Sequence, residues 1–342
     1  MMTSVTHHTV AIEQIEQMLL GARRRELDIN DLLRRAGIPP SLLASPKSRV
    51  TQAQCAALIS LLRYRLRDEL WGLCPHPLPL GSFEMGCRIV IGCRTLGEAL
   101  RAGLRYYRLL LRDFSPHLRV TQGEARFCLA PHASRDASLA YAERSFSFLA
   151  YGLACWLVAR RLPLLAVDYP QSAIGRSTDA GVLFQAPLHY GTLCGWRFEA
   201  RWLELPVVQN EQSLEQFLRQ APANLLVKHR DQTSVTERIR RILRRHLDTT
   251  PPSLTDIGRQ LAMTPQTLRR RLRLEGQGFR AIKDDLRRDV AVEYLARPEL
   301  SLPEIAALLG FSEASTFHRA FKHWTGIAPG EYRQTRLHRP RE

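Results

Sequence analysis

The stretch SLTDIGRQLAMTPQTLRRRL, residues 253–272, recurs in altered form 48 residues further on as SLPEIAALLGFSEASTFHRAF, residues 301–321. Each copy opens with a serine followed three residues later by an acid, Asp256 or Glu304, which is the pattern of a capping box at the start of a helix. Apolar residues then recur at helical spacing, so we expect them to form the buried stripe of a short helix. They are Leu254, Ile257 and Leu261 in the first copy and Leu302, Ile305 and Leu309 in the second.

A tight turn and a second helix are expected to follow in each copy. Gly310 suits a left-handed residue in the second turn, whereas the first copy has Ala262 there. The next helix is predicted to start at Thr264-Pro265 in the first copy, and at Ser312 in the second, whose turn is one residue longer. Helix, short turn, helix is the helix-turn-helix plan, in which the second helix enters the major groove of DNA.

The polar faces of the two second helices favour DNA binding over a generic helical hairpin. Four arginines occupy the five positions from Arg269 to Arg273, more positive charge than a merely solvated helix needs. The second copy has smaller groups, so we expect it to contribute position more than discrimination between sequences. For Arg319, an ion pair between helices is the alternative role. The candidate DNA-binding residues are Gln266, Thr267, Arg269, Arg270 and Arg273 in the first copy, and Ala314, Ser315, Thr316, His318, Arg319 and Lys322 in the second.

The segment between the two copies predicts one helix over residues 279–296, with a regular series of apolar side chains. A rigid helix there would hold the two units about one turn of DNA apart, roughly 34 Å. One monomer would then reach two successive major grooves. Residues 238–245 carry five arginines opposite a further apolar stripe. They are interpreted as the solvated face of the domain's first helix, with a phosphate contact as the alternative.

The charge balance of the chain indicates an anionic partner. The 342 residues include 49 basic and 33 acidic side chains, a formal charge of +16. Residues 232–342 hold 21 basic and 13 acidic groups, whereas the twice longer remainder holds 28 and 20, so the excess is denser near the C-terminus. Nucleic acid is the commonest partner of such a surface, with an acidic membrane surface or simple solubility as alternatives.

The N-terminal part predicts an α+β domain that precedes the all-α domain. Helices are expected between residues 10 and 70, from a capping box at Thr95 and Glu98, and over 137–161. Strands are expected at 117–122 and 125–130, joined by a turn at Gly123-Glu124, and at 164–168 and 193–199. The predicted division is a sensor domain over 1–210, a linker over 211–234 and a double helix-turn-helix domain over 235–338.

Several classes of protein are disfavoured by what the sequence lacks. The seven cysteines show no metal spacing, so we interpret them as free thiols and expect no metal and no cofactor. The first 30 residues contain Glu13 and Glu16 and do not read as a secretory signal, and no apolar run approaches 18 residues. A cytoplasmic protein without a membrane span is therefore expected. No catalytic motif stands out, so we predict that the chain is not an enzyme.

The residues of the last hundred positions resemble a known family. The tail GFSEASTFHRAFKHWTGIAPGEYR, residues 310–333, closely resembles the AraC/XylS family of bacterial transcription regulators, over about residues 235–335. Residues 33–39, 92–100 and 162–168 resemble the arabinose-binding-type N-terminal domain of one subgroup, a historical label that does not imply arabinose. The resemblance implies that Gln266, Arg269 and Arg270 contact bases in one groove. It likewise implies that Ser315, Thr316 and Arg319 serve the other.

These observations predict a sequence-specific transcription regulator that binds promoter DNA and responds to a small-molecule effector. The resemblance implies activation rather than repression, together with contact to RNA polymerase, and a homodimer stays open. Two alternatives remain: a DNA-repair alkyl acceptor that uses a cysteine, and a non-specific architectural DNA binder. Five residues are candidates for an effector pocket, although packing is the commoner role of such side chains: Tyr106, Tyr107, Arg108, Arg112 and Trp196.

Overall fold

The computed structural model of the chain describes residues 9–170, 184, 186–219, 235–247, 251–274 and 278–337. Its contacts divide the chain into two compact units. Unit 1 comprises Met1–Glu16, Ile29–Leu58 and Gln232–Glu342, and unit 2 comprises Gln17–Asp28 and Ile59–Asp231. Within the parts that the structure describes, no helix combines the length and hydropathy needed to cross a membrane.

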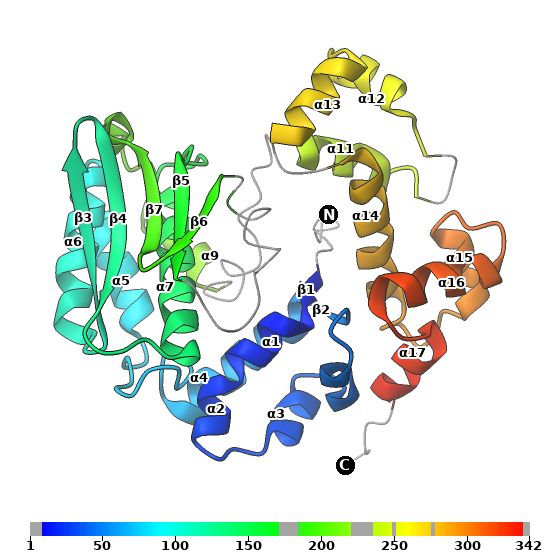
Figure 1. Cartoon of the computed structure of the whole chain (residues 1–342), viewed down its shortest axis with the longest axis horizontal. Coiled ribbons are helices and arrows are strands. Elements are labelled where there is room, and N and C mark those ends of the chain that lie inside the picture. Colours follow the sequence, from blue (N-terminus) through cyan, green and yellow to red (C-terminus); the bar gives the residue numbers. More distant parts are fainter. Residues whose placement is uncertain are drawn as a thin grey trace. The chain divides into compact units, whose positions relative to one another are not determined.

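Unit 2 contains a five-stranded sheet with the order β3-β4-β7-β5-β6, in which only β5 and β6 run parallel (Figure 1). The β3–β4 turn is Gln122-Gly123, with φ of 49° and 80°, rather than the predicted Gly123-Glu124. Two successive positive φ values fit a two-residue hairpin, and Glu124 is already paired with Thr121. The strands are β3 (Phe114–Thr121), β4 (Glu124–Pro131), β5 (Ala166–Pro170), β6 (Leu188–Gly191) and β7 (Cys194–Glu199).

Helices cover the apolar face of this sheet. Alternate β4 side chains are buried, and the Phe127 ring stacks on that of Trp196 at 4.8 Å between centroids. The predicted helix 137–161 ends at Leu157, because Ala159 adopts a left-handed backbone conformation. The helices are α2 (Leu20–Arg24), α5 (Ser82–Ile91), α6 (Leu96–Leu110), α7 (Ala137–Leu157), the 3₁₀ helix η2 (Ala200–Glu204) and α9 (Glu211–Leu218).

Helix α9 occupies the first part of the segment predicted as a linker. Asn210 and Ser213 form its capping box, and its Leu214 is fully buried. Leu214 belongs to a cluster with Phe83 and Leu149, so α9 packs within unit 2. Residues 220–234 lie outside the described residues, and the remainder of the linker stays a prediction.

The five candidate pocket residues have different surroundings. Trp196 is fully buried in the core, which agrees with the favoured packing interpretation. Tyr106 packs edge-on against Tyr107 at 5.1 Å, and Arg108 donates a hydrogen bond to the Pro116 carbonyl. Arg112 is exposed. Tyr107 lines a cavity.

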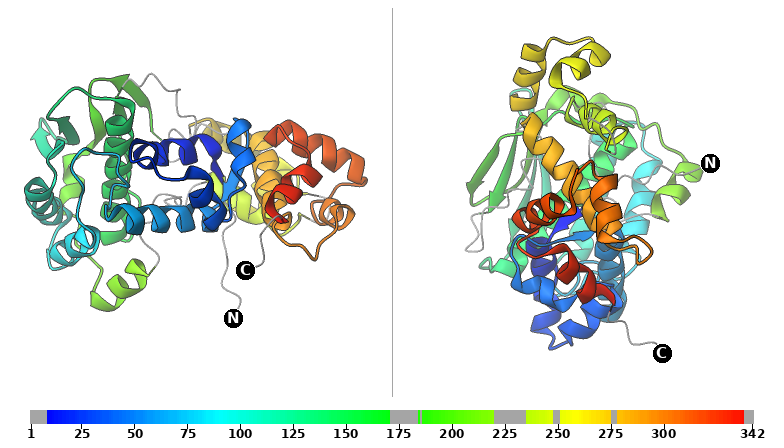
Figure 2. Two further views of the ribbon diagram at one scale, coloured as in Figure 1. Left: turned by 90° about the horizontal axis from the view of Figure 1, so that it is seen from below. Right: turned by 90° about the vertical axis from the view of Figure 1, so that its right-hand side faces the viewer.

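Unit 1 contains the two predicted helix-turn-helix hairpins, α12–α13 and α15–α16. The long helix α14 runs between them, as predicted (Figures 1 and 2). The helices are α11 (Val235–Arg244), α12 (Leu254–Leu261), α13 (Pro265–Leu274), α14 (Phe279–Tyr294), α15 (Leu302–Leu308), α16 (Ala314–Thr325) and α17 (Pro329–Leu337).

Residues from the chain's N-terminus also belong to unit 1, which the sequence did not indicate. They form β1 (Thr9–Ala11) and β2 (Arg49–Thr51), an antiparallel pair whose second strand contacts α14. Ser45 Oγ donates to the Thr325 carbonyl at 3.1 Å, and Tyr332 Oη donates to the Arg49 carbonyl at 2.6 Å. The other elements are α3 (Ile29–Arg35), the 3₁₀ helix η1 (Pro40–Ala44), and α1 (Ile12–Met18) and α4 (Gln52–Leu66), which continue into unit 2.

A buried ion pair joins these parts of unit 1. Arg240 of α11 lies 2.8 Å from the Asp289 carboxylate of α14, and both side chains are only 4% exposed. Thr9 Oγ1 donates to the other carboxylate oxygen of Asp289. The interpretation of residues 238–245 as a solvated or phosphate-binding face is therefore wrong for Arg240, because that guanidinium faces into the unit.

Replacing Asp289 by alanine would leave the Arg240 guanidinium buried without this partner. We expect Asp289→Ala to lower the free energy of unfolding by about 3–5 kcal/mol. The matched control is Asp284→Ala, because Asp284 lies on the same helix but pairs at 4.0 Å with the almost fully exposed Arg280. We expect the control to change stability by less than about 0.5 kcal/mol. Urea denaturation followed by circular dichroism measures both, and equal effects would contradict a central role for the buried pair.

Candidate nucleic-acid interface

Capping boxes begin the first helix of each hairpin, as predicted. Ser253 Oγ accepts from the Asp256 amide at 3.2 Å, and the Asp256 carboxylate accepts from the Ser253 amide at 3.0 Å. Ser301 and Glu304 form the same reciprocal bonds, at 3.3 and 2.7 Å. Ser253 Oγ also donates to the Asp256 carboxylate at 2.6 Å, and the bonds from this hydroxyl and from the Ser253 amide hold the pKa of Asp256 below its usual range. In Glu304 the Ser301 amide is the main cause of a lowered pKa.

Residues 262–264 separate α12 from α13, and residues 309–313 separate α15 from α16; the part of the turn after the left-handed residue is one residue longer in the second hairpin, as expected from the aligned copies. Ala262 adopts a left-handed conformation with φ 53° and ψ 43°, and Gly310 takes this role at φ 72°. The second helix of the first hairpin starts at Pro265, as predicted. That of the second hairpin starts at Ala314 rather than at Ser312, because Glu313 is still extended, with φ −137° and ψ 140°.

Gly258 allows a close approach within the first hairpin. A Cβ atom on Gly258 would lie 2.6 Å from the Met263 carbonyl oxygen, which is far inside van der Waals contact. The equivalent residue of the second hairpin is Ala306, in a unit with the longer turn. A glycine inside a short helix is the sequence signal for this close approach.

Helix α13 presents a strongly basic face to solvent. Leu268 and Leu272 are buried, whereas Gln266, Arg269, Arg270 and Arg273 are exposed and Thr267 is partly exposed. In the described part of the chain, none of these three arginines takes part in an ion pair. Their guanidinium groups are therefore available for carboxylate, phosphate or guanine acceptors, which suit the planar geometry of arginine.

Helix α16 presents a smaller and more mixed face. Phe317 and Phe321 are buried, and the predicted residues lie on the opposite, accessible side. Ser315 Oγ donates to the Glu313 carboxylate at 2.9 Å, so an acidic group stands at the start of this helix. Among the described residues Arg319 forms no ion pair, which disfavours its alternative role between helices. Ala314, Ser315, His318, Arg319 and Lys322 are exposed, and Thr316 is partly exposed.

Two family models match the chain. Residues 27–207 match the arabinose-binding domain of AraC transcription regulators, N-terminal, and residues 257–335 match a helix-turn-helix domain. The first match covers more than half of the chain. The chain belongs to the AraC family of transcriptional regulators. The predicted fold class, an α+β part followed by a helical domain with two helix-turn-helix units, is confirmed for this AraC-family regulator.

Relatives over nearly the full length of the regulator are also transcriptional regulators. The ornithine utilization regulator of Pseudomonas aeruginosa is 29% identical over 318 residues, 87% of this chain and 88% of that protein. An uncharacterized HTH-type transcriptional regulator of Mycobacterium tuberculosis is 30% identical over 91% of this chain and 92% of its own length. The regulator VirS of M. tuberculosis is 42% identical over 100 residues, 29% of each chain.

A methyl group at position 258 should disturb the first hairpin alone. We expect Gly258→Ala to lower the free energy of unfolding by about 1–3 kcal/mol, because the new Cβ displaces the Met263 carbonyl. The control is Gly330→Ala in the same unit, because among the described residues a Cβ there would make only an ordinary van der Waals contact, 3.8 Å from Leu302 Cδ1. Urea denaturation of the two variants measures the difference. A stability unchanged by Gly258→Ala would show that the turn relaxes without cost.

Proposed function

We propose that this AraC-family regulator reads its promoter mainly through α13. The observation that carries the proposal is the exposed group Arg269, Arg270 and Arg273, which has no ion pair with any described residue and lies on the face opposite the buried Leu268 and Leu272. Arginine binds guanine O6 and N7 with two hydrogen bonds, which is the commonest specific contact in the major groove. Gln266, Arg269 and Arg270 would contact base edges, and Thr267 and Arg273 would contact the backbone.

The second hairpin would serve mainly to position the protein. Ser315, Thr316 and Arg319 would enter a neighbouring major groove, with Ala314, His318 and Lys322 at its edges. The Glu313 carboxylate beside Ser315 repels phosphate, so this hairpin would add little non-specific attraction to the DNA backbone. Helix α14 has 16 residues and is about 24 Å long at 1.5 Å per residue. A helix of this length supports a model in which α13 and α16 are held apart along one face of the DNA.

The remaining features of the proposal concern signalling. We infer a sensor domain over 1–210, a linker over 211–234 and the DNA-binding domain over 235–338, with the N-terminal strands of unit 1 as an added contact to the DNA-binding helices. A small-molecule effector would bind the sensor domain, and the regulator would activate transcription in the cytoplasm through RNA polymerase, as a monomer or a homodimer. The AraC-type N-terminal match supports a ligand-binding role.

Substitution of Arg269 tests direct reading of a base. We expect Arg269→Ala to weaken binding to the regulator's own promoter by about 1–3 kcal/mol and to remove discrimination at one base pair. The control is Arg94→Ala, which removes an equal charge from an 89% exposed side chain of unit 2. Fluorescence anisotropy with wild-type and single-substituted promoter duplexes, at one salt concentration, measures both variants. If Arg269→Ala weakens binding equally for promoter and random duplexes, Arg269 is only a phosphate contact.

The two alternative functions find little support. An alkyl acceptor needs an activated thiolate, whereas burial raises the pKa of six of the seven thiols, to about 12 for Cys55 and Cys87. A non-specific architectural binder would show no preference between promoter and random duplex. The anisotropy experiment therefore separates it from a sequence-specific regulator.

A further inference from the structure

Unit 2 contains a cavity of about 70 Å³ between α5, α6, α7 and strand β4. Of the 17 residues that line it, 15 are apolar, and the two others are Glu69 and Tyr107. Space of this kind is unusual, because protein interiors are packed as densely as organic crystals. All the lining residues belong to unit 2, so the cavity is a property of that unit alone.

Small residues on two helices leave this space open. Ala99 and Gly103 are four positions apart on α6, and Ala150 and Ala154 are four apart on α7, so each pair lies on one face of its helix. A Cβ on Gly103 would come within 3.2 Å of Val90 Cγ1, another lining residue. Four larger side chains at these positions would fill the cavity, and the unit instead leaves it open.

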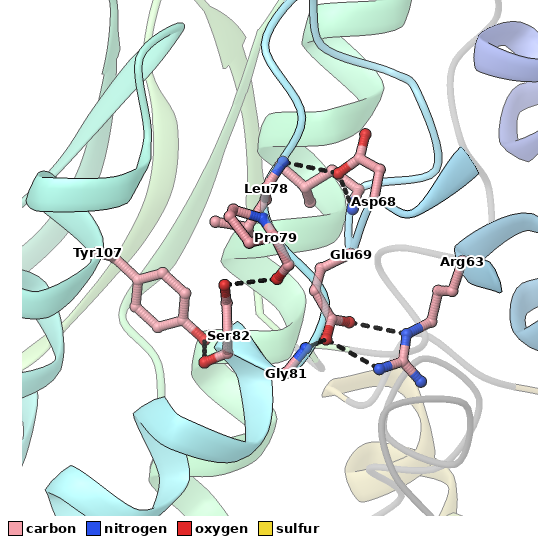
Figure 3. A network of polar contacts seen from close by, with 9 residues as sticks. Arg63, Asp68, Glu69, Leu78, Pro79, Gly81, Ser82 and Tyr107 are labelled. Atoms are coloured by element: carbon pink, nitrogen blue, oxygen red, sulfur yellow. Dashed lines mark hydrogen bonds and ion pairs between the residues drawn. The ribbon is translucent and has the colours of Figure 1, made fainter. Parts of the chain in front are cut away.

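The charged side chain of the lining, Glu69, is already neutralised by Arg63 of α4 and bonded to its own loop. Arg63 donates to both oxygens of Glu69, from Nε at 2.7 Å and from Nη2 at 2.9 Å. The Gly81 amide donates to Glu69 Oε1 at 2.8 Å (Figure 3). The neighbouring Asp68 carboxylate accepts from the backbone amides of the same loop, including that of Leu78 at 2.8 Å. A charged ligand would therefore meet no unpaired opposite charge here.

Tyr107 supplies a neutral hydrogen-bond donor at the edge of the cavity. Burial raises its pKa well above the usual value for tyrosine, so the phenol stays protonated at neutral pH. Its hydroxyl lies 3.5 Å from the Ser82 carbonyl oxygen, longer than the usual range of an O–H···O bond (Figure 3). The ring is held edge-on against Phe146 at 4.9 Å, and its hydroxyl end lies against Gly86 and Ser82 of α5, so the donor stands where α5 borders the cavity.

We propose that this cavity binds an uncharged, mainly apolar small molecule that carries one hydrogen-bond acceptor, such as a ketone oxygen. Apolar groups would fill the space beside Ala150 and Ala154, and Tyr107 Oη would donate to the acceptor. A zwitterionic amino acid would lose its hydration without gaining an ionic partner, so the lining disfavours ligands of the ornithine type. The inference rests on the proposed function only in treating the bound molecule as the regulator's effector.

The test uses the full-length protein and four probes at matched concentrations: acetophenone, ethylbenzene, benzoate and L-ornithine. Isothermal titration calorimetry without DNA is expected to show saturable binding of the first two alone. Tyr107→Phe should weaken acetophenone roughly 2- to 10-fold, the value of one hydrogen bond, and leave ethylbenzene unchanged. The matched control is Tyr106→Phe, because Tyr106 does not line the cavity, and it should leave both affinities unchanged.

A cavity-filling variant tests the location independently. Ala150→Leu should abolish binding of both aromatic probes, and Gly103→Ala, a smaller change, should weaken both if the leucine variant does not fold. Binding that survives both substitutions, or saturable binding of benzoate or L-ornithine, would overturn the proposal. A Tyr106→Phe effect equal to that of Tyr107→Phe would overturn the role of the phenol. Because no DNA is present, a wild-type regulator that binds promoter and random duplexes equally in the anisotropy experiment would refute the proposed function without touching this result.

Discussion

The buried Arg240–Asp289 ion pair constrains the rest of the DNA-binding unit. Removing two charges from water is expensive, and their attraction offsets that cost only when the geometry is tightly held. Here Asp289 of α14 meets Arg240 of α11 on one side and the Thr9 hydroxyl of β1 on the other. Helix α14 is therefore held by polar contacts from two segments that precede it in the sequence, and it runs between the two hairpins. Its orientation sets where each second helix can meet DNA.

The two hairpins show how one plan gives unequal surfaces. Both use a serine–acid capping box and a left-handed residue, so the backbone of each is defined by the same local interactions. The differences lie in what the second helix exposes: a row of arginines on α13, and small side chains with a nearby carboxylate on α16. The buried face of each second helix thus stabilises its hairpin, and the exposed face is the one that would meet DNA. The exposed residues can therefore differ between the hairpins without a change in the core.

Local patterns predicted the hairpins well because every signal they use lies within a few residues. The capping serines bond to amides three residues away, Pro265 and Gly310 act through their own backbone, and the exposed arginines follow from helical periodicity alone. The partners of Arg240 and Tyr332 could not be predicted, because Asp289 and Arg49 are brought to them by tertiary packing across long stretches of chain. The extended Glu313 was also missed, because nothing in a run of small polar residues marks where a helix begins.

The cavity was invisible to the sequence for a related reason: it depends on which small residues of α6 and α7 face each other. A space of 70 Å³ forgoes about 2 kcal/mol of packing, at roughly 24 cal/mol per Å³. A molecule that fills it restores those contacts, so the folded unit is stabilised by RT ln(1 + L/Kd), which grows with the ligand concentration L. The polar groups at its edge gain nothing from a ligand, because the Glu69–Arg63 pair is satisfied with or without one. The cavity therefore favours an uncharged molecule, because the carboxylate in its lining is already paired with Arg63 before any ligand binds.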